Sequence, residues 1–266
     1  MANRIDAKFE ELKKAGKKAL VTYILAGDAG YETTEEAVLA MEQSGVDIIE
    51  IGVPFSDPIA EGKVIQEASL RSLRDNHTTL AGVFEMVARL RKKTDMPLLL
   101  MLYANTIFRT GTDFFFDKCA ELGIDGVIVP DLPFEEHDEF REAAARNNVH
   151  NISLVTPTSH GRIGKIAAEA SGFLYCVSSV GVTGMRDSFS TDFDAFFDEV
   201  KASAKVPYCV GFGIRDGETA RKMAAYCDGV IVGSAIVNKV AEFGSKAVPE
   251  IAALCKELRA GLDAAH

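Results

Sequence analysis

The stretch IEIGVPFSDPIAEGKVIQ (residues 49–66) begins inside an apolar run, residues 47–53, that predicts a buried strand of a parallel sheet. This strand carries a carboxylate, Glu50, in its middle, and burying a charge is costly unless the charge is paired or used. A second carboxylate, Glu61, follows in a loop that contains two prolines and a glycine. Two carboxylates in this arrangement suit acid–base catalysis, although a structural strand glutamate and a surface loop glutamate explain the pattern equally well.

The same kind of unit recurs along the chain. Apolar runs predict strands at residues 19–26, 48–53, 97–102, 126–129, 151–155, 173–177, 208–211 and 229–232. Amphipathic stretches between them predict helices, and Ile5, Phe9 and Leu12 mark an extra helix at the amino terminus. Strands that alternate with helices pair in parallel through right-handed crossovers. Eight such units in about 250 residues predict an α/β fold, a (β/α)8 TIM barrel that forms a single domain over residues 1–266.

Composition excludes several classes of protein. The chain has 266 residues, of which 47% are apolar, and its net charge of -10 argues against a nucleic-acid or anionic-membrane surface. Its five cysteines show no C-x-x-C spacing, so neither a disulfide framework nor a zinc site is expected. The longest apolar run, residues 96–104, is far shorter than the roughly 20 residues that span a bilayer. We therefore expect a cytoplasmic protein without a bound metal.

Two glycine motifs follow the last two expected strands. Gly211, Phe212 and Gly213 come after the seventh strand, and Gly233 and Ser234 come after the eighth and open a helix. The loops after these strands form the usual phosphate site of the barrel, and a helix start offers free N–H groups to an anion. Each motif alone is more often explained by turn geometry. Together, in this order, they predict a phosphorylated substrate.

The remaining residues limit the chemistry. No lysine lies in an expected strand, which argues against a Schiff-base aldolase. Two connections, from residue 53 to the helix near Leu80 and at residues 178–191, are long enough to act as lids. The pattern favours proton transfer by carboxylates on a phosphorylated aromatic substrate. Tyr23, Tyr175 and Phe212 lie near strand ends as candidate ring contacts, although each alone is explained by core packing.

Six motifs together resemble the tryptophan synthase alpha subunit family. They are EIGVPFSDPIAEG at 50–62, YAN at 103–105, VPDLP at 129–133, GVTG at 181–184, GFGI at 211–214 and GSAIV at 233–237. The likeness runs through nearly the whole chain in order. The first and fourth motifs are very specific to that family.

The resemblance implies a barrel that cleaves indole-3-glycerol phosphate to indole and glyceraldehyde 3-phosphate by a retro-aldol reaction, without a cofactor. Glu50 matches the family's strand glutamate, which moves protons between indole C3 and the glycerol hydroxyl. Glu61 stands where the family usually has an aspartate that accepts the indole N–H. Thr183 and Tyr175 match residues that orient this second carboxylate, and Tyr23 stands where a phenylalanine often lines the indole pocket.

The resemblance also implies a phosphate cradle and a partner. The residues that match the cradle are Gly184, Gly213, Gly233 and Ser234. The implied partner is the tryptophan synthase beta subunit, in an alpha2beta2 complex. Asp57 and Pro58, in the loop after the second strand, match the family's interface.

The chain departs from the family pattern at two positions. Glu61 is one methylene longer than the usual aspartate, and Lys63 stands where the family often has proline. Lys63 is either a solvated lysine or a residue that pairs with Glu61 in the open loop and releases it on closure. These departures leave open a weakly catalytic subunit that mainly activates beta. A stand-alone lyase that releases indole is a second alternative. A phosphosugar isomerase or epimerase is a third, but it would need different groups at the strand ends.

Overall fold

The computed structural model describes residues 2–177, 192–211 and 213–265. Three expected site residues, Thr183, Gly184 and Phe212, lie outside these ranges. The described strands are Ala19–Leu25 (β1), Ile48–Gly52 (β2), Leu98–Met101 (β3), Gly126–Ile128 (β4), His150–Asn151 (β5), Ser153–Val155 (β6), Leu174–Val177 (β7), Tyr208–Gly211 (β8) and Gly229–Val232 (β9). They match the eight expected strands, except that the fifth is divided into β5 and β6.

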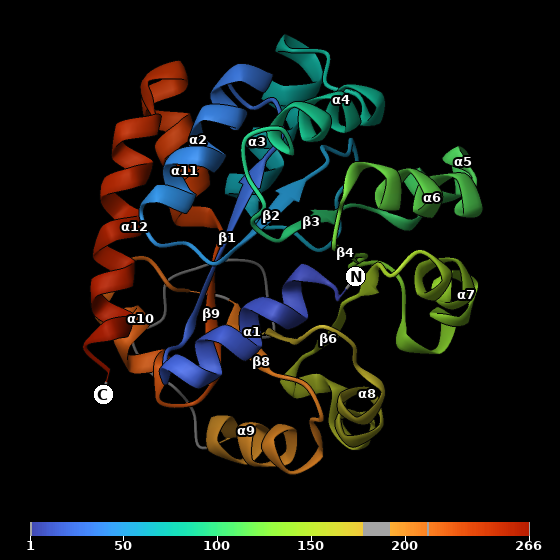
Figure 1. Cartoon of the computed structure of the whole chain (residues 1–266), viewed down its shortest axis with the longest axis vertical. Helices are drawn as coiled ribbons and strands as arrows, with labels where there is room; N and C mark the ends of the chain where they lie inside the picture. The colour runs from blue at the N-terminus through green and yellow to red at the C-terminus, as the bar shows by residue number, and fades with distance from the viewer. Residues whose placement is uncertain (1, 178–191, 212, 266) are drawn as a thin grey trace.

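The sheet closes on itself. Its order is β5-β4-β3-β2-β1-β9-β8-β7-β6, and every described pairing is parallel. The two strands at the ends of this order, β5 and β6, follow each other in the sequence and are separated only by Ile152. The N–H of Ile152 donates to Val127 O at 2.9 Å, which continues the pairing with β4. The expected (β/α)8 barrel is therefore confirmed, and Figure 1 shows the helices as a ring around the strands.

The helices include one that the sequence reasoning missed. Their bounds are Arg4–Ala15 (α1), Tyr31–Gln43 (α2), Lys63–Asp75 (α3), Leu80–Leu90 (α4), Ala104–Thr110 (α5), Thr112–Leu122 (α6), Asp138–Arg146 (α7), Ile163–Glu169 (α8), Asp192–Ser203 (α9), Gly217–Ala224 (α10), Ser234–Phe243 (α11) and Val248–Asp263 (α12). Short 3-10 helices lie at Phe134–Glu136, Pro157–Arg162 and Gly244–Lys246. Helix α3 lies inside the connection that we expected to be one long loop. Its fully buried residues are small, Ala68, Ser69 and Ser72, and its larger apolar residues Val64 and Ile65 are only partly buried.

Helix α1 closes the amino-terminal end of the barrel, as Figure 1 shows. Its buried residues are the predicted Ile5, Phe9 and Leu12. They form one apolar cluster with barrel residues that include Val21, Ile48, Leu99, Ile128, Ile152, Phe173 and Ile231. The extra amino-terminal helix therefore belongs to the core.

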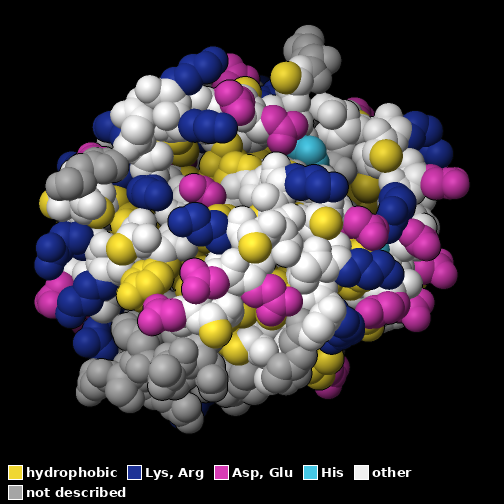
Figure 2. All heavy atoms as spheres, turned by 90° about the horizontal axis from the view of Figure 1, so that it is seen from below, with side chains coloured by type: hydrophobic (Ala, Val, Ile, Leu, Met, Phe, Trp, Pro, Cys, Tyr) yellow, Lys and Arg dark blue, Asp and Glu magenta, His cyan; other side chains and the backbone are white. Residues whose placement is uncertain are grey.

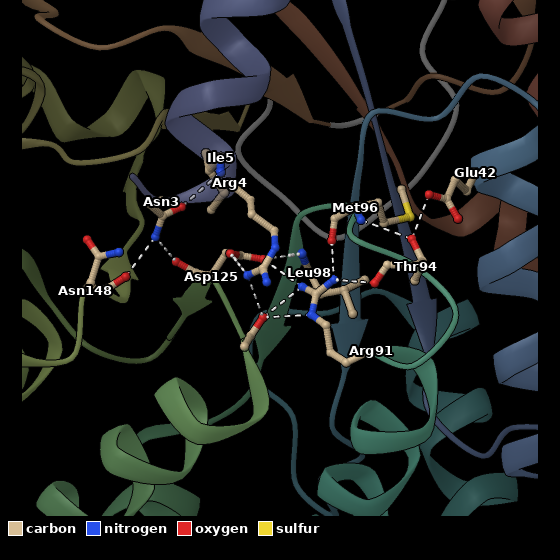
Figure 3. A network of polar contacts seen from close by, with 11 residues as sticks. Asn3, Arg4, Ile5, Glu42, Arg91, Thr94, Met96, Leu98, Asp125 and Asn148 are labelled. Carbon is tan, nitrogen blue, oxygen red and sulfur yellow. Dashed lines mark hydrogen bonds and ion pairs between the residues drawn. The ribbon is translucent and has the colours of Figure 1, made fainter. Parts of the chain in front are cut away.

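A polar network fixes the same end of the barrel (Figure 3). The buried Asp125 carboxylate accepts hydrogen bonds from Arg4 Nη1 at 3.0 Å, Arg91 Nη2 at 2.8 Å and Leu98 N at 3.0 Å. Asn3 Nδ2 donates to Asp125 O at 2.8 Å. Donors from α1, from the end of α4 and from β3 thus meet at the Asp125 side chain, and Asn3 adds a hydrogen bond to its backbone.

Arg91 completes this network from the end of α4. Its guanidinium also donates to the carbonyl oxygens of Gly123, at 2.8 and 2.9 Å, and Met96, at 2.6 Å. Burial lowers the pKa of Arg91, and the charge of Asp125 opposes that effect. A buried cation of this kind depends on its anion.

The outer surface carries charges of both signs. Figure 2 views the side of α8 and α9, and acidic and basic side chains are intermixed over it. No helix in the described ranges has the length and apolar character needed to cross a membrane.

We expect Asp125→Ala to destabilise the fold by about 3–5 kcal/mol, because it leaves the buried Arg91 cation unpaired. Asp113, whose ion pair with Arg146 at 2.9 Å is exposed, provides the matched control. Asp113→Ala should cost less than about 1 kcal/mol. Urea unfolding of both variants measures the difference, and equal losses would contradict the role of Asp125.

Candidate active site

Glu50 points into the barrel because of the alternation of strand β2. Ile48 belongs to the interior cluster beneath it, whereas Ile49 and Ile51 face the surrounding helices. Glu50 is opposite Tyr23 in β1 and Leu99 in β3, and its exposed fraction is 1%. The predicted buried position of this carboxylate is confirmed.

The surroundings of Glu50 favour its protonated form. Burial raises the pKa of Glu50 to about 8. Its Oε1 atom has no hydrogen-bond partner within the described part of the chain. A carboxylic acid with this pKa is protonated at neutral pH and can serve as a general acid.

Tyr23 lies beside Glu50 and extends over Gly52. A Cβ added at Gly52 would lie 2.1 Å from the Tyr23 hydroxyl oxygen, so only glycine leaves room for the ring. The pKa of Tyr23 is raised first by burial and then by the charges of Glu61 and Glu50. Tyr23 therefore lies within reach of both carboxylates.

Tyr175 occupies a corresponding place on β7. Its ring covers Gly211 of β8, where an added Cβ would lie 2.4 Å from the ring. The pKa of Tyr175 is raised by burial and then by the charge of Glu50. Two expected ring contacts, Tyr23 and Tyr175, are thus brought together around Glu50, and Phe212 lies outside the described residues.

Glu61 is held against the barrel by a residue whose role the sequence reasoning missed. Glu61 is 8% exposed, and its Oε2 accepts a hydrogen bond from the Tyr103 hydroxyl. The same hydroxyl oxygen accepts from Ile59 N at 2.8 Å and Ala60 N at 3.0 Å. Tyr103 directly follows the expected strand at residues 97–102, so its place at a strand end was available as a signal.

The pKa of Glu61 is raised overall, although its surroundings act on it in both directions. Burial raises it most, and the charge of Asp131 adds to that. The hydrogen bonds from Tyr103 and from the loop backbone lower it. Glu61 therefore has donors that favour its ionised form, whereas none is described for Glu50.

Lys63 does not pair with Glu61. It is the first residue of α3, its side chain is 85% exposed, and its ammonium lies 3.6 Å from Glu67 Oε1. In this structure Lys63 is thus a solvated lysine beside an exposed glutamate. The departure from proline at this position therefore leaves the charge of Glu61 unneutralised by Lys63.

The expected phosphate residues lie at the ends of neighbouring strands. Gly233 precedes Ser234, the first residue of α11, whose first N–H groups lack partners within the helix. Gly213 has φ +72° and follows β8, the neighbour of β9. A Cβ added at Gly233 would lie 3.5 Å from Tyr23, so the cradle adjoins the pocket wall. Gly184 and Thr183 lie outside the described residues.

The expected partner residues lie in the loop between β2 and α3. Asp57 is exposed and Pro58 partly exposed. The next residue, Ile59, presents an exposed apolar side chain. This loop leads directly from the surface to Glu61.

Other features of the described residues do not compete with this site. No group of three or more histidine, cysteine, aspartate or glutamate side chains among them could hold a metal ion. Hollows of about 280 Å³ between α7 and α8 and about 530 Å³ beside α1 contain neither Glu50 nor Glu61. The barrel's carboxyl end is where the two carboxylates and the glycine motifs converge.

Comparison with known proteins gives the family. The profile of the family described as "Tryptophan synthase alpha chain" matches residues 9–263. The alpha chain of Alkaliphilus metalliredigens is 45% identical over 240 residues, which is 90% of each chain. That of Lacticaseibacillus casei is 44% identical over 247 residues, 93% of this chain and 92% of its own.

Solved structures agree with these relatives. The tryptophan synthase subunit alpha of Legionella pneumophila superposes with a TM-score of 0.90 at 37% identity, over 99% of this chain and 100% of its own. A chain of Mycobacterium tuberculosis tryptophan synthase gives 0.89 at 33% identity, over 98% of this chain and 99% of its own. The chain belongs to the tryptophan synthase alpha chain family.

Proposed function

We propose that Glu50 and Glu61 are the acid–base pair that cleaves indole-3-glycerol phosphate in this chain. As a member of its family, the chain is a carbon–carbon lyase that forms indole and glyceraldehyde 3-phosphate. One observation supports the assignment of roles: both buried carboxylates lie near Tyr23, and only Glu61 has a described hydrogen-bond donor to its side chain. Environments that differ in this way let one carboxylate act as an acid while the other stays ionised.

Glu50 acts twice in this proposal. As a neutral acid it donates its proton to indole C3, which leaves a positive charge on the ring. As a carboxylate it then accepts the proton of the neighbouring glycerol hydroxyl, while the bond from C3 to that carbon breaks and an aldehyde forms. Its proton is thereby restored, so the cycle is balanced without a cofactor. The pKa of about 8 suits both steps near neutral pH.

Glu61 stays ionised throughout the cycle. Its carboxylate accepts the indole N–H and stabilises the positive charge that C3 protonation places on the ring. Its partial exclusion from water strengthens that interaction. The longer side chain, in place of the family's usual aspartate, is accommodated because the loop holds it against Tyr103.

The far end of the substrate is bound by the glycine motifs. Gly213, Gly233 and Ser234, together with Gly184, would offer backbone N–H groups and a helix start to the phosphate. Tyr23 adjoins both Gly233 and the carboxylates and would line the indole pocket with Tyr175. Binding at the phosphate fixes the distance of the reacting bond from Glu50.

The partner in this proposal is a tryptophan synthase beta subunit, in an alpha2beta2 complex that would receive the indole. Asp57 and Pro58 would contact it, and their accessibility in the loop before Glu61 supports that role. Contact there would act directly on the position of Glu61. The five cysteines are buried and free, which supports a reducing compartment, the cytoplasm.

We expect Glu50→Gln to lower kcat roughly 100-fold to 10,000-fold, because the amide keeps the shape of the side chain but cannot exchange a proton. Glu121→Gln, which alters an exposed carboxylate paired with Lys118, is the matched control and should leave kcat unchanged. Turnover of indole-3-glycerol phosphate with beta present gives the result, and circular dichroism checks the fold. Turnover of Glu50→Gln equal to the control would refute the assignment.

The proposal also fixes the pH dependence. Glu50 must be protonated in the free enzyme, and its raised pKa keeps it so below about pH 8. We therefore expect kcat/KM to fall as pH rises through about 8 and to fall on the acid side as Glu61 becomes protonated. Rates from pH 5 to 9.5 at constant ionic strength measure both limbs. A value that stays level up to pH 9.5 would show that Glu50 is not the acid.

A further inference from the structure

We propose that Tyr103 is a positioning residue for the reaction, which orients the Glu61 carboxylate and keeps it ionised. This inference rests on the proposed function and deepens it, because it states why one of the two buried carboxylates stays ionised. Tyr103 need not touch the reacting atoms. It acts through Glu61.

The hydrogen bonds of the Tyr103 hydroxyl fix the direction of its proton. A phenolic hydroxyl can donate one hydrogen bond and accept two. Its oxygen accepts from the backbone N–H groups of Ile59 and Ala60, at 2.8 and 3.0 Å. Both acceptor positions are thus occupied by groups that can only donate. The proton must therefore point to Glu61 Oε2, which has to be the acceptor.

A donor aimed at Glu61 favours the carboxylate over the carboxylic acid. Burial works in the opposite direction and raises the pKa of Glu61, and the charge of Asp131 at the end of β4 adds to this. Among the described residues, Tyr23 from β1 and Tyr103 after β3 are further ionisable groups within its reach, and Lys63 is engaged with Glu67. The Tyr103 hydroxyl, the largest of the hydrogen-bond contributions that lower this pKa, therefore acts with the loop backbone against burial and Asp131.

Tyr103 is itself held in place by its neighbours. Its ring stacks on Phe55 with a centroid distance of 4.5 Å and an interplanar angle of 14°. The next residue, Ala104, donates its N–H to Asp131 Oδ1 at 2.9 Å. A residue fixed at a strand end therefore sets the position of a side chain that belongs to a loop. This also explains how a glutamate, with its extra methylene, fits where the family usually has aspartate.

The test uses Tyr103→Phe, which keeps the ring and its stack on Phe55 but removes the hydroxyl. We expect kcat to fall roughly tenfold to hundredfold and the acid limb of kcat/KM to move up by about one to two pH units. The alkaline limb, set by Glu50, should stay near pH 8. The matched control is Tyr31→Phe, which removes a hydroxyl bonded to the backbone of Thr79. Tyr31→Phe should shift neither the acid nor the alkaline limb of the kcat/KM profile.

The same substitution made in a Glu61→Gln protein shows whether Tyr103 acts through Glu61, and so tests this proposal separately from the proposed function. Glutamine at position 61 has no charge to preserve, so Tyr103→Phe should cost less than about threefold in a Glu61→Gln protein. Equal losses in both backgrounds, or an acid limb that stays in place, would overturn the role of Tyr103 while leaving that of Glu61 intact. Wild-type turnover of Glu61→Gln alone would instead remove the proposed function, and this inference with it.

Discussion

The closed parallel barrel imposes one constraint on everything else in the molecule, because every second residue of each strand must face a filled interior. In β2 this alternation sends Ile48 and Glu50 inward and Ile49 and Ile51 outward. The carboxylate is therefore buried by strand geometry, and its raised pKa follows from that burial. The chemistry of Glu50 and the packing of the barrel have the same origin.

The two ends of the barrel divide stability from function. At the amino-terminal end, α1 and the Asp125 network satisfy buried apolar and polar groups, and Asp125 gathers donors from three separate segments (Figure 3). At the carboxyl end, Glu50 Oε1 has no partner among the described residues and Tyr103 holds a loop side chain. The Asp125 carboxylate is thus fully engaged at the end that stabilises the barrel. One carboxylate oxygen of Glu50 is left available at the end where the reaction takes place.

The sequence was sufficient for the architecture because strand and helix patterns are local. It predicted the barrel, the buried face of α1 and the inward position of Glu50. It missed α3, whose fully buried positions, such as Ala68 and Ser72, carry small side chains and so give a weaker apolar pattern than large aliphatic residues would. It also missed the contact between Tyr103 and Glu61, which are 42 residues apart, because that contact depends on the course of a loop. The roles of Thr183, Gly184 and Phe212 stay predictions.

The glycines beneath the two pocket tyrosines have a consequence for the size of the molecule that the pocket can admit. Tyr23 and Tyr175 occupy the space that side chains at Gly52 and Gly211 would need. A methyl group at either position would have to displace the ring above it, and so would change the shape of the pocket that the rings line. The space open to a substrate ring thus depends on Gly52 and Gly211, which have no side chain and lie beneath the two tyrosine rings. Those positions offer a way to alter substrate selectivity that leaves both carboxylates untouched.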